Sequence, residues 1–185
     1  MNAASKPSPP SGRTYLEQHA LPVYLRDVIQ LVLSRRDDRP LDHIYEYFKS
    51  VSDGNNVISA GNGENQVTAG SGSDTIRTGS NDDTVIAGNG NNDISVGNGD
   101  NTVSAGSGAD RVTAGSGDDR LVVGDGQNTV SAGSGDNYVS AGRDSDVITA
   151  GSGDDTIYGG DGSNRIGAGD GDNRVTAGSG SDTIT

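Results

Sequence analysis

From residue 52 to residue 185, apolar and polar positions recur with a period of nine residues. The blocks SDGNNVISA, GNGENQVTA and GSGSDTIRT open the array, which continues through fourteen full repeats and eight residues of a fifteenth. Position seven of every repeat is Ile, Val or Leu. Side chains alternate along a strand, so a short strand at positions six to eight would point position seven alone inward. The pattern predicts a mainly β solenoid with a thin, regular core.

Two further features of the repeat predict how it turns and stacks. Gly holds position one in fourteen repeats and position three in thirteen, and Gly supplies the positive φ of a tight turn. Position four is acidic in every even-numbered repeat and in none of the odd-numbered ones. The structural period is therefore 18 residues, and two nonapeptides form one coil of a parallel solenoid. The acidic residues that would stack as a column along one edge are Glu64, Asp82, Asp100, Asp118, Asp136, Asp154 and Asp172.

Residues 14–51 show helical periodicity, after a polar leader at 1–13 that we expect to be disordered. One apolar stripe at 3.6-residue spacing predicts a helix over 21–35, and a second predicts another helix that opens at Pro40. Two helices this short bury too little surface to be stable alone, so we expect this segment to dimerise as a four-helix bundle. The apolar residues that would close the bundle are Leu21, Leu25, Val28, Ile29, Val32, Leu41, Ile44, Tyr45 and Phe48.

Composition and charge narrow the function classes. The chain has no Cys, which excludes disulfides, thiolate zinc sites and Cys nucleophiles. The net charge is −13, and residues 52–185 hold twenty acidic but six basic groups, so their surface repels nucleic acid and attracts cations. No stretch is long and apolar enough for a membrane span. His19 and His43 stand in no catalytic motif, and we predict that the protein is not an enzyme.

The array from 52 to 185 resembles the calcium-binding nonapeptide repeats of RTX (hemolysin-type) proteins, whose pattern is G-G-x-G-x-D-x-U-x. The resemblance implies a parallel β-roll with Ca²⁺ held in the Gly-rich turns between successive coils, by carboxylate and carbonyl oxygens. The motif's first Gly is usually Ala in this chain. The motif's Asp falls on position five, where the residues that would hold the metal are Asp74, Asp83, Asp110, Asp119, Asp146, Asp155 and Asp182.

In the other eight repeats position five is Asn, and the order runs Asn, Asn, Asp, Asp along the array. With two repeats per coil, every Asp would stack on an Asn of the neighbouring coil. One interpretation is a weak calcium site built from one Asp together with Asn and backbone oxygens. The other is a metal-independent ladder, in which Asn amides donate hydrogen bonds to neighbouring carboxylates. The Asn residues are Asn56 and, as weaker metal neighbours, Asn65, Asn92, Asn101, Asn128, Asn137, Asn164 and Asn173.

The helical segment resembles a second family over about residues 14–51. The family is the dimerisation/docking helix pair of the type-II regulatory subunit of protein kinase A and of Dpy-thirty proteins. Asp27 stands where that family usually has Gly. The resemblance implies an X-shaped dimer with a groove for an amphipathic helix of a partner, while closing the dimer alone is the simpler reading. The residues that carry it are Tyr15-Leu16-Glu17-Gln18, Leu21-Pro22-Val23-x-Leu25, Arg39-Pro40-Leu41 and Ile44-Tyr45-x-Tyr47-Phe48.

Together these features predict a dimeric calcium-binding adaptor with three parts, at 1–13, 14–51 and 52–185. The alternative is a metal-independent β-solenoid spacer whose function is limited to protein–protein association. The first twenty residues hold no apolar signal-peptide core, so we expect an intracellular protein of the cytoplasm, cilium or nucleus, with secretion left open. The array stops inside a repeat at Thr185, from which we expect an open coil edge and a longer natural chain.

Overall fold

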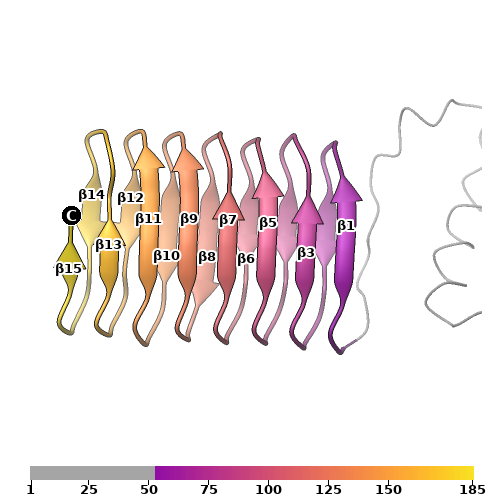
Figure 1. Ribbon diagram of the computed structural model, residues 1–185, viewed down its shortest axis with the longest axis horizontal. Coiled ribbons are helices and arrows are strands. Elements are labelled where there is room, and N and C mark those ends of the chain that lie inside the picture. Colours follow the sequence, from indigo (N-terminus) through magenta and orange to yellow (C-terminus); the bar gives the residue numbers. More distant parts are fainter. Residues whose placement is uncertain (1–52) are drawn as a thin grey trace, which may run out of the picture. The chain divides into compact units, whose positions relative to one another are not determined.

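The structure, a computed structural model, describes residues 53–185. This part of the chain is a parallel β-solenoid of about seven turns without a helix, as the nonapeptide pattern predicts (Figure 1). The predicted leader at 1–13 and the predicted helix pair at 14–51 lie outside the described residues. The described residues contain no helix that could cross a membrane.

The strands form two parallel sheets that face each other, and each coil contributes one strand to each sheet (Figure 1). One sheet holds the odd-numbered strands β1 (Val57–Gly61), β3 (Thr75–Thr78), β5 (Asp93–Gly97), β7 (Arg111–Ala114), β9 (Thr129–Ser134), β11 (Val147–Ser152), β13 (Arg165–Gly167) and β15 (Thr183–Ile184). The other holds β2 (Gln66–Thr68), β4 (Thr84–Ile86), β6 (Thr102–Ser104), β8 (Arg120–Gly124), β10 (Tyr138–Ala141), β12 (Thr156–Tyr158) and β14 (Arg174–Thr176).

The register between neighbouring strands confirms the 18-residue coil. Ile58 pairs with Ile76, which pairs with Ile94, and the same offset runs through both sheets. Equivalent positions of successive coils therefore lie directly above one another. Each repeat thus begins with a turn at one edge of the roll, and turns of even-numbered and odd-numbered repeats occupy opposite edges (Figure 1).

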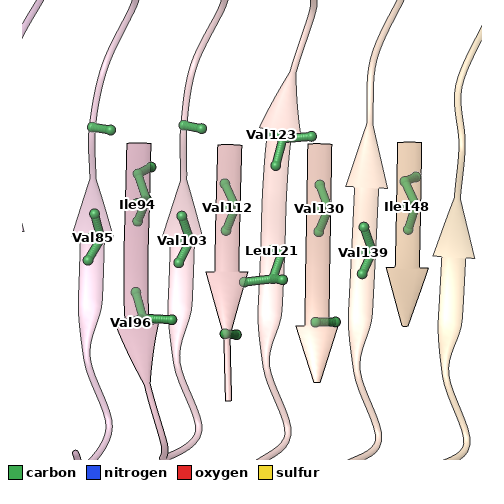
Figure 2. Close-up of a cluster of buried hydrophobic side chains, with 14 of the residues drawn as sticks. Val85, Ile94, Val96, Val103, Val112, Leu121, Val123, Val130, Val139 and Ile148 are labelled. Carbon is green, nitrogen blue, oxygen red and sulfur yellow. The ribbon is translucent and has the colours of Figure 1, made fainter. Parts of the chain in front are cut away.

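The core is wider than the sequence pattern predicts. Position-seven side chains are buried from Ile58 to Ile166 and form rows along the inside of both sheets (Figure 2). The prediction that position seven alone points inward is wrong, because positions five and nine also point inward. The backbone stays extended beyond positions six to eight. Positions five and nine lie two residues from position seven, so their side chains point to the same, inner face. The buried position-nine residues are Ala69, Ala87, Val96, Ala105, Ala114, Val123, Ala132, Ala150 and Ala168.

The turns depend on glycine for two physical reasons, which Gly97 at position one illustrates. Its φ is +75°, a region that residues with a Cβ rarely adopt. A Cβ at Gly97 would also lie 1.8 Å from the carbonyl oxygen of Gly79 in the preceding coil. At position three, where two repeats lack Gly, Asn81 and Asp144 take φ values of 84° and 80°. Asn and Asp tolerate this conformation better than other side chains do.

We expect Gly97→Ala to destabilise the roll, because the new methyl group would force two coils apart. The left-handed backbone alone costs on the order of 1–3 kcal/mol, and the clash with Gly79 adds to that cost. Gly167→Ala is the matched control, since a Cβ there meets nothing closer than 3.7 Å. Chemical denaturation of both variants measures the difference. Equal loss of stability in the two variants would contradict this explanation of the turns.

The outer faces of the sheets carry a few paired side chains. On the odd sheet, Arg77 and Arg111 lie 3.7 and 3.9 Å from the carboxylate of Asp93. These ion pairs are exposed and contribute little to stability. On the even sheet, the guanidinium of Arg120 lies 4.4 Å from the ring centre of Tyr138 in the next coil. These contacts lie on the outer surface of the sheets, away from the buried position-five residues.

Candidate metal centre

The side chains at position five form two buried columns, one just inside each row of turns. Each residue directly precedes a strand, whose inward alternation brings its side chain under the turn. As the sequence predicts, Asp and Asn alternate from coil to coil in both columns. One column holds Asn56, Asp74, Asn92, Asp110, Asn128, Asp146, Asn164 and Asp182, and the other holds Asn65, Asp83, Asn101, Asp119, Asn137, Asp155 and Asn173. From Asn65 to Asn164 these side chains are buried.

Where an Asn precedes an Asp in a column, its backbone N–H donates to the carboxylate of the next coil, and in four of the seven such pairs its side-chain Nδ2 donates to the same oxygen. The backbone N–H and the side-chain Nδ2 of Asn101 both lie 2.9 Å from Oδ1 of Asp119. The same pair of bonds joins Asn92 to Asp110, at 2.8 and 2.9 Å. Oδ1 of each of these Asp residues is thus fully engaged by the coil before it.

Where an Asp precedes an Asn, only the backbone N–H of the Asp bonds to the next position-five side chain. The backbone N–H of Asp110 donates to Oδ1 of Asn128 at 2.9 Å, and Asp119 donates to Asn137 at 3.0 Å. The second carboxylate oxygen, Oδ2, is buried and has no hydrogen-bond partner among residues 53–185. A buried charged oxygen without a partner is costly, and a cation is the usual compensation. The six residues in this state are Asp74, Asp83, Asp110, Asp119, Asp146 and Asp155.

Burial shifts the acidity of these carboxyls in the metal-free roll. Desolvation raises the pKa of Asp110 and that of Asp146 to about 6, although hydrogen bonds from Asn92 and Asn128 oppose the shift. Desolvation also raises the pKa of Asp119 and that of Asp155. The ionised form is therefore disfavoured unless a positive charge lies nearby.

The two edges differ in charge, because the acidic column at position four follows only the even-numbered turns. The structure confirms this column: the backbone N–H of Asp118 donates to Oδ1 of Asp100 at 2.8 Å, and the pattern continues from Asp82 to Asp172. Asp100 and Asp118 also help to raise the pKa of Asp119. A cation at this edge is thus attracted by exposed carboxylates as well as by the buried one.

The oxygens around position five fit Ca²⁺ by their chemistry. Beside the buried Asn side chains lie main-chain carbonyls of the turn glycines. Carbonyl and carboxylate oxygens are the hard ligands that Ca²⁺ prefers. Asn92 shows which carbonyls these are, because its Nδ2 lies 3.2 Å from the Gly88 oxygen and 3.1 Å from the Gly90 oxygen. Among residues 53–185 no cluster of three acidic or His side chains could hold a metal. A Ca²⁺ ion at position five would therefore need backbone oxygens as ligands beside the single carboxylate.

A parallel β-roll with carboxylate and carbonyl oxygens gathered between its coils defines the class of cation-binding β-solenoids. The family model for RTX calcium-binding nonapeptide repeats matches seven overlapping segments, which together run from residue 50 to residue 184. The chain belongs to this family of calcium-binding repeats, whose β-solenoids are structural and not typically enzymatic. Comparison with curated proteins and comparison with solved structures each returned no significant match.

Sequence reasoning identified the position-five residues but not the backbone atoms that surround them. The turn carbonyls carry no side-chain signal. The recurring glycines at positions one and three were a usable sign, because a Cβ at most of these positions would meet a carbonyl of the neighbouring coil. Asp182 differs from the other predicted ligands: it is only half-buried, in the last coil, and accepts the N–H of Asn164 at 2.9 Å.

The raised pKa values predict that the metal-free roll is more stable at pH 5 than at pH 7.5. A folded-state pKa of about 6 for Asp110 and Asp146 exceeds the unfolded value of about 3.9. Their protonation therefore stabilises the fold fully below about pH 4, and this contribution disappears as the pH rises through about 6. Thermal unfolding in metal-free buffer should show a melting temperature several degrees higher at pH 5. The double variant Asp110→Asn, Asp146→Asn should lose part of this difference, and an unchanged difference would contradict the assignment.

Proposed function

We propose that this protein is a dimeric calcium-binding adaptor, in which calcium stiffens the β-roll and residues 14–51 join two chains. The observation that carries the calcium part is the set of six buried carboxylate oxygens without a hydrogen-bond partner among the described residues. Each would receive the cation that its burial requires. The adaptor would present two rigid rods from one dimer, and we propose no enzymatic role for it.

Calcium would act by holding successive coils together. Between the coils of Asp110 and Asn128, for example, the ligands would be Oδ2 of Asp110, Oδ1 of Asn128 and carbonyls of the adjoining turns. These oxygens come from two coils, so they gather only when the chain is coiled. Metal binding is then coupled to folding, and calcium supplies the positive charge that compensates the buried carboxylate.

The charge of each site suggests weak binding. One carboxylate per site leaves most of the coordination to neutral oxygens, and sites of low ligand charge bind calcium with lower affinity. Extracellular modules of this kind have Kd values on the order of 10⁻⁴–10⁻³ M. A roll with such affinity would be loaded constantly outside the cell, whereas inside a cell it would respond only to high local calcium.

A second candidate function has an observation of its own in its favour. The Asn side chains donate to the neighbouring carboxylates, for example Asn65 to Asp83 at 2.9 Å. A roll stabilised by these bonds alone would be a metal-independent spacer between partners. Calorimetric titration of the full chain with Ca²⁺ distinguishes the two. The calcium proposal expects saturable heat that Mg²⁺ does not reproduce, because Mg²⁺ demands a smaller octahedral site. Absence of saturable heat up to millimolar calcium would favour the spacer.

The adaptor part of the proposal is supported by the helix pattern and the family resemblance of residues 14–51. Its apolar residues include Leu25, Ile29 and Ile44, which would form the dimer and a groove for a partner's amphipathic helix. We propose an intracellular location for the same reason, because proteins with such helix pairs typically work inside the cell.

We predict that the full chain is a dimer and that a chain beginning at residue 52 is a monomer. Light scattering of both chains in calcium measures their masses, for which one chain is 18.7 kDa. Ile29→Asp in the full chain is a second test, because a buried charge should break the bundle while it leaves the roll intact. If the shortened chain is still dimeric, the proposed role of residues 14–51 is wrong.

A further inference from the structure

The steps between successive position-five residues are of two kinds, which alternate along both columns. In seven steps an Asn precedes an Asp, and the backbone N–H of that Asn donates to Oδ1 of the Asp at 2.7–2.9 Å. In six steps an Asp precedes an Asn. The Asp residues that begin these six steps are the same six whose Oδ2 has no hydrogen-bond partner in the part of the chain that the structure describes. The kind of step therefore decides whether the polar atoms between two coils are satisfied.

In an Asn-to-Asp step, one amide nitrogen lies within a ring of oxygens. Nδ2 of Asn92 lies 3.2 Å from the Gly88 oxygen, 3.1 Å from the Gly90 oxygen, 3.2 Å from the Ala105 oxygen and 2.9 Å from Oδ1 of Asp110. These are three carbonyls and a carboxylate from two successive coils. The oxygen types are those that would surround a calcium ion between the coils.

The bonding of the other amide atom shows that the nitrogen, and not the oxygen, faces this ring. Oδ1 of Asn92 accepts the backbone N–H of Asp74 at 3.0 Å, and Oδ1 of Asn101 accepts that of Asp83 at the same distance. Nδ2 is then the atom turned toward the carbonyls. The arrangement recurs at Asn65, whose Nδ2 lies 3.0 Å from the Gly61 oxygen and 2.7 Å from the Gly63 oxygen.

At an Asp the same backbone frame presents an oxygen instead of the amide nitrogen. Oδ1 of Asp119 accepts the N–H of Asn101, as Oδ1 of an Asn accepts that of the Asp before it. Oδ2 is then the equivalent of Nδ2, and the equivalent carbonyls by register belong to Gly115 and Gly117. Oδ2 of Asp119 would then face these carbonyl oxygens without a hydrogen atom between them, and the oxygens would repel each other. A cation relieves this repulsion, and an amide group avoids it.

We propose that the buried Asn amides take the place of calcium at every second step, so that calcium binds only at the six Asp-to-Asn steps. This inference rests on the proposed calcium function and deepens it. Without metal, unpartnered carboxylate oxygens then remain at six of the thirteen steps among the described residues, and the other seven are closed by Asn. Along one edge, calcium ions would be two coils apart, at about 9.6 Å instead of about 4.8 Å. The greater spacing halves the repulsion between neighbouring divalent ions.

Two variants in adjacent steps of one column test the proposal, in the full chain. Asp119→Asn replaces the carboxylate that would bind calcium with an amide. Asn101→Asp replaces an amide that fills a step with a carboxylate that would bind calcium. For each variant, bound calcium per chain is counted at saturation by equilibrium dialysis, and thermal unfolding is followed in metal-free buffer. The wild-type chain is measured beside them.

We expect Asp119→Asn to bind five calcium ions where the wild-type chain binds six, and to melt at a higher temperature than wild type without metal. We expect Asn101→Asp to bind seven and to melt lower without metal, with the loss recovered in calcium. An Asp119→Asn chain that melts lower without metal would overturn the proposal, as would unchanged calcium counts in both variants. If wild type binds no calcium, the proposed function fails, while the metal-free melting of Asp119→Asn still decides whether an amide fills the step.

Discussion

Removing calcium from the folded chain is expected to lower its stability more than any single substitution does. A ligand that binds only the folded state stabilises it by RT ln(1 + [L]/Kd) per site, which is about 1.4 kcal/mol when millimolar calcium is about ten times a Kd of about 10⁻⁴ M. Six such sites would together add about 8.5 kcal/mol, which is comparable with the total stability of an ordinary domain, about 5–15 kcal/mol. The measurement is thermal unfolding of the full chain with millimolar calcium and then with excess chelator. We expect the melting temperature to fall by tens of degrees, while the metal-free roll stays folded at low temperature.

The acidic surface makes a control necessary for this experiment. Any cation screens the exposed carboxylates of the column from Asp82 to Asp172, whether or not it enters the buried steps. The chelated sample is therefore compared with samples that contain Mg²⁺ or NaCl at matched ionic strength. Recovery by calcium alone supports binding inside the turns. Equal recovery by Mg²⁺ or NaCl would mean that surface screening explains the effect.

The second large effect is expected at the core. Ile148 in β11 is 1% exposed and pairs with Val130 and Ile166 in the neighbouring coils. Ile148→Ala would leave a cavity in a core that is only one layer thick, with few neighbours able to move into it. Loss of about 2–5 kcal/mol in the free energy of unfolding is expected. Chemical denaturation in saturating calcium measures it.

Ile86 is the matched control for this substitution. It has the same side chain and also lies in an inner coil, at the end of β4, but it is 45% exposed because position eight points outward. Ile86→Ala should cost about 0.5 kcal/mol or less, as substitutions on the surface usually do. Similar losses at both positions would show that the inward and outward assignment of the strands is incorrect.

The repeating pattern predicted most of this fold, because each structural requirement recurs at a fixed position. Position four alone established the 18-residue coil, since only even-numbered repeats carry an acid there. The width of the core could not be inferred in the same way. Ala69 and Ala87 are small, so their hydrophobic signal is weak, and Asn65 and Asp74 are polar, so burial was not expected of them. Their burial follows from strand alternation beyond positions six to eight.

The candidate site was predicted by its side chains and completed by its backbone. The alternation of Asn and Asp was visible in the sequence, and it left both a calcium site and a metal-free ladder possible. The structure shows ladder bonds in one kind of step and unpartnered carboxylate oxygens in the other: Asn101 satisfies Oδ1 of Asp119, and nothing among residues 53–185 satisfies its Oδ2. The sequence treats all seven Asp residues alike, whereas Asp182 is only half-buried and is not among the six.

The number of calcium ions bound by one full chain tests the central claim most directly. Equilibrium dialysis against buffered calcium at neutral pH, with the metal content measured at saturation, yields this number. The account predicts six ions per chain, one for each buried carboxylate that lacks a partner. A count of zero would contradict calcium binding by the roll, and a count of thirteen would contradict its restriction to the Asp-to-Asn steps.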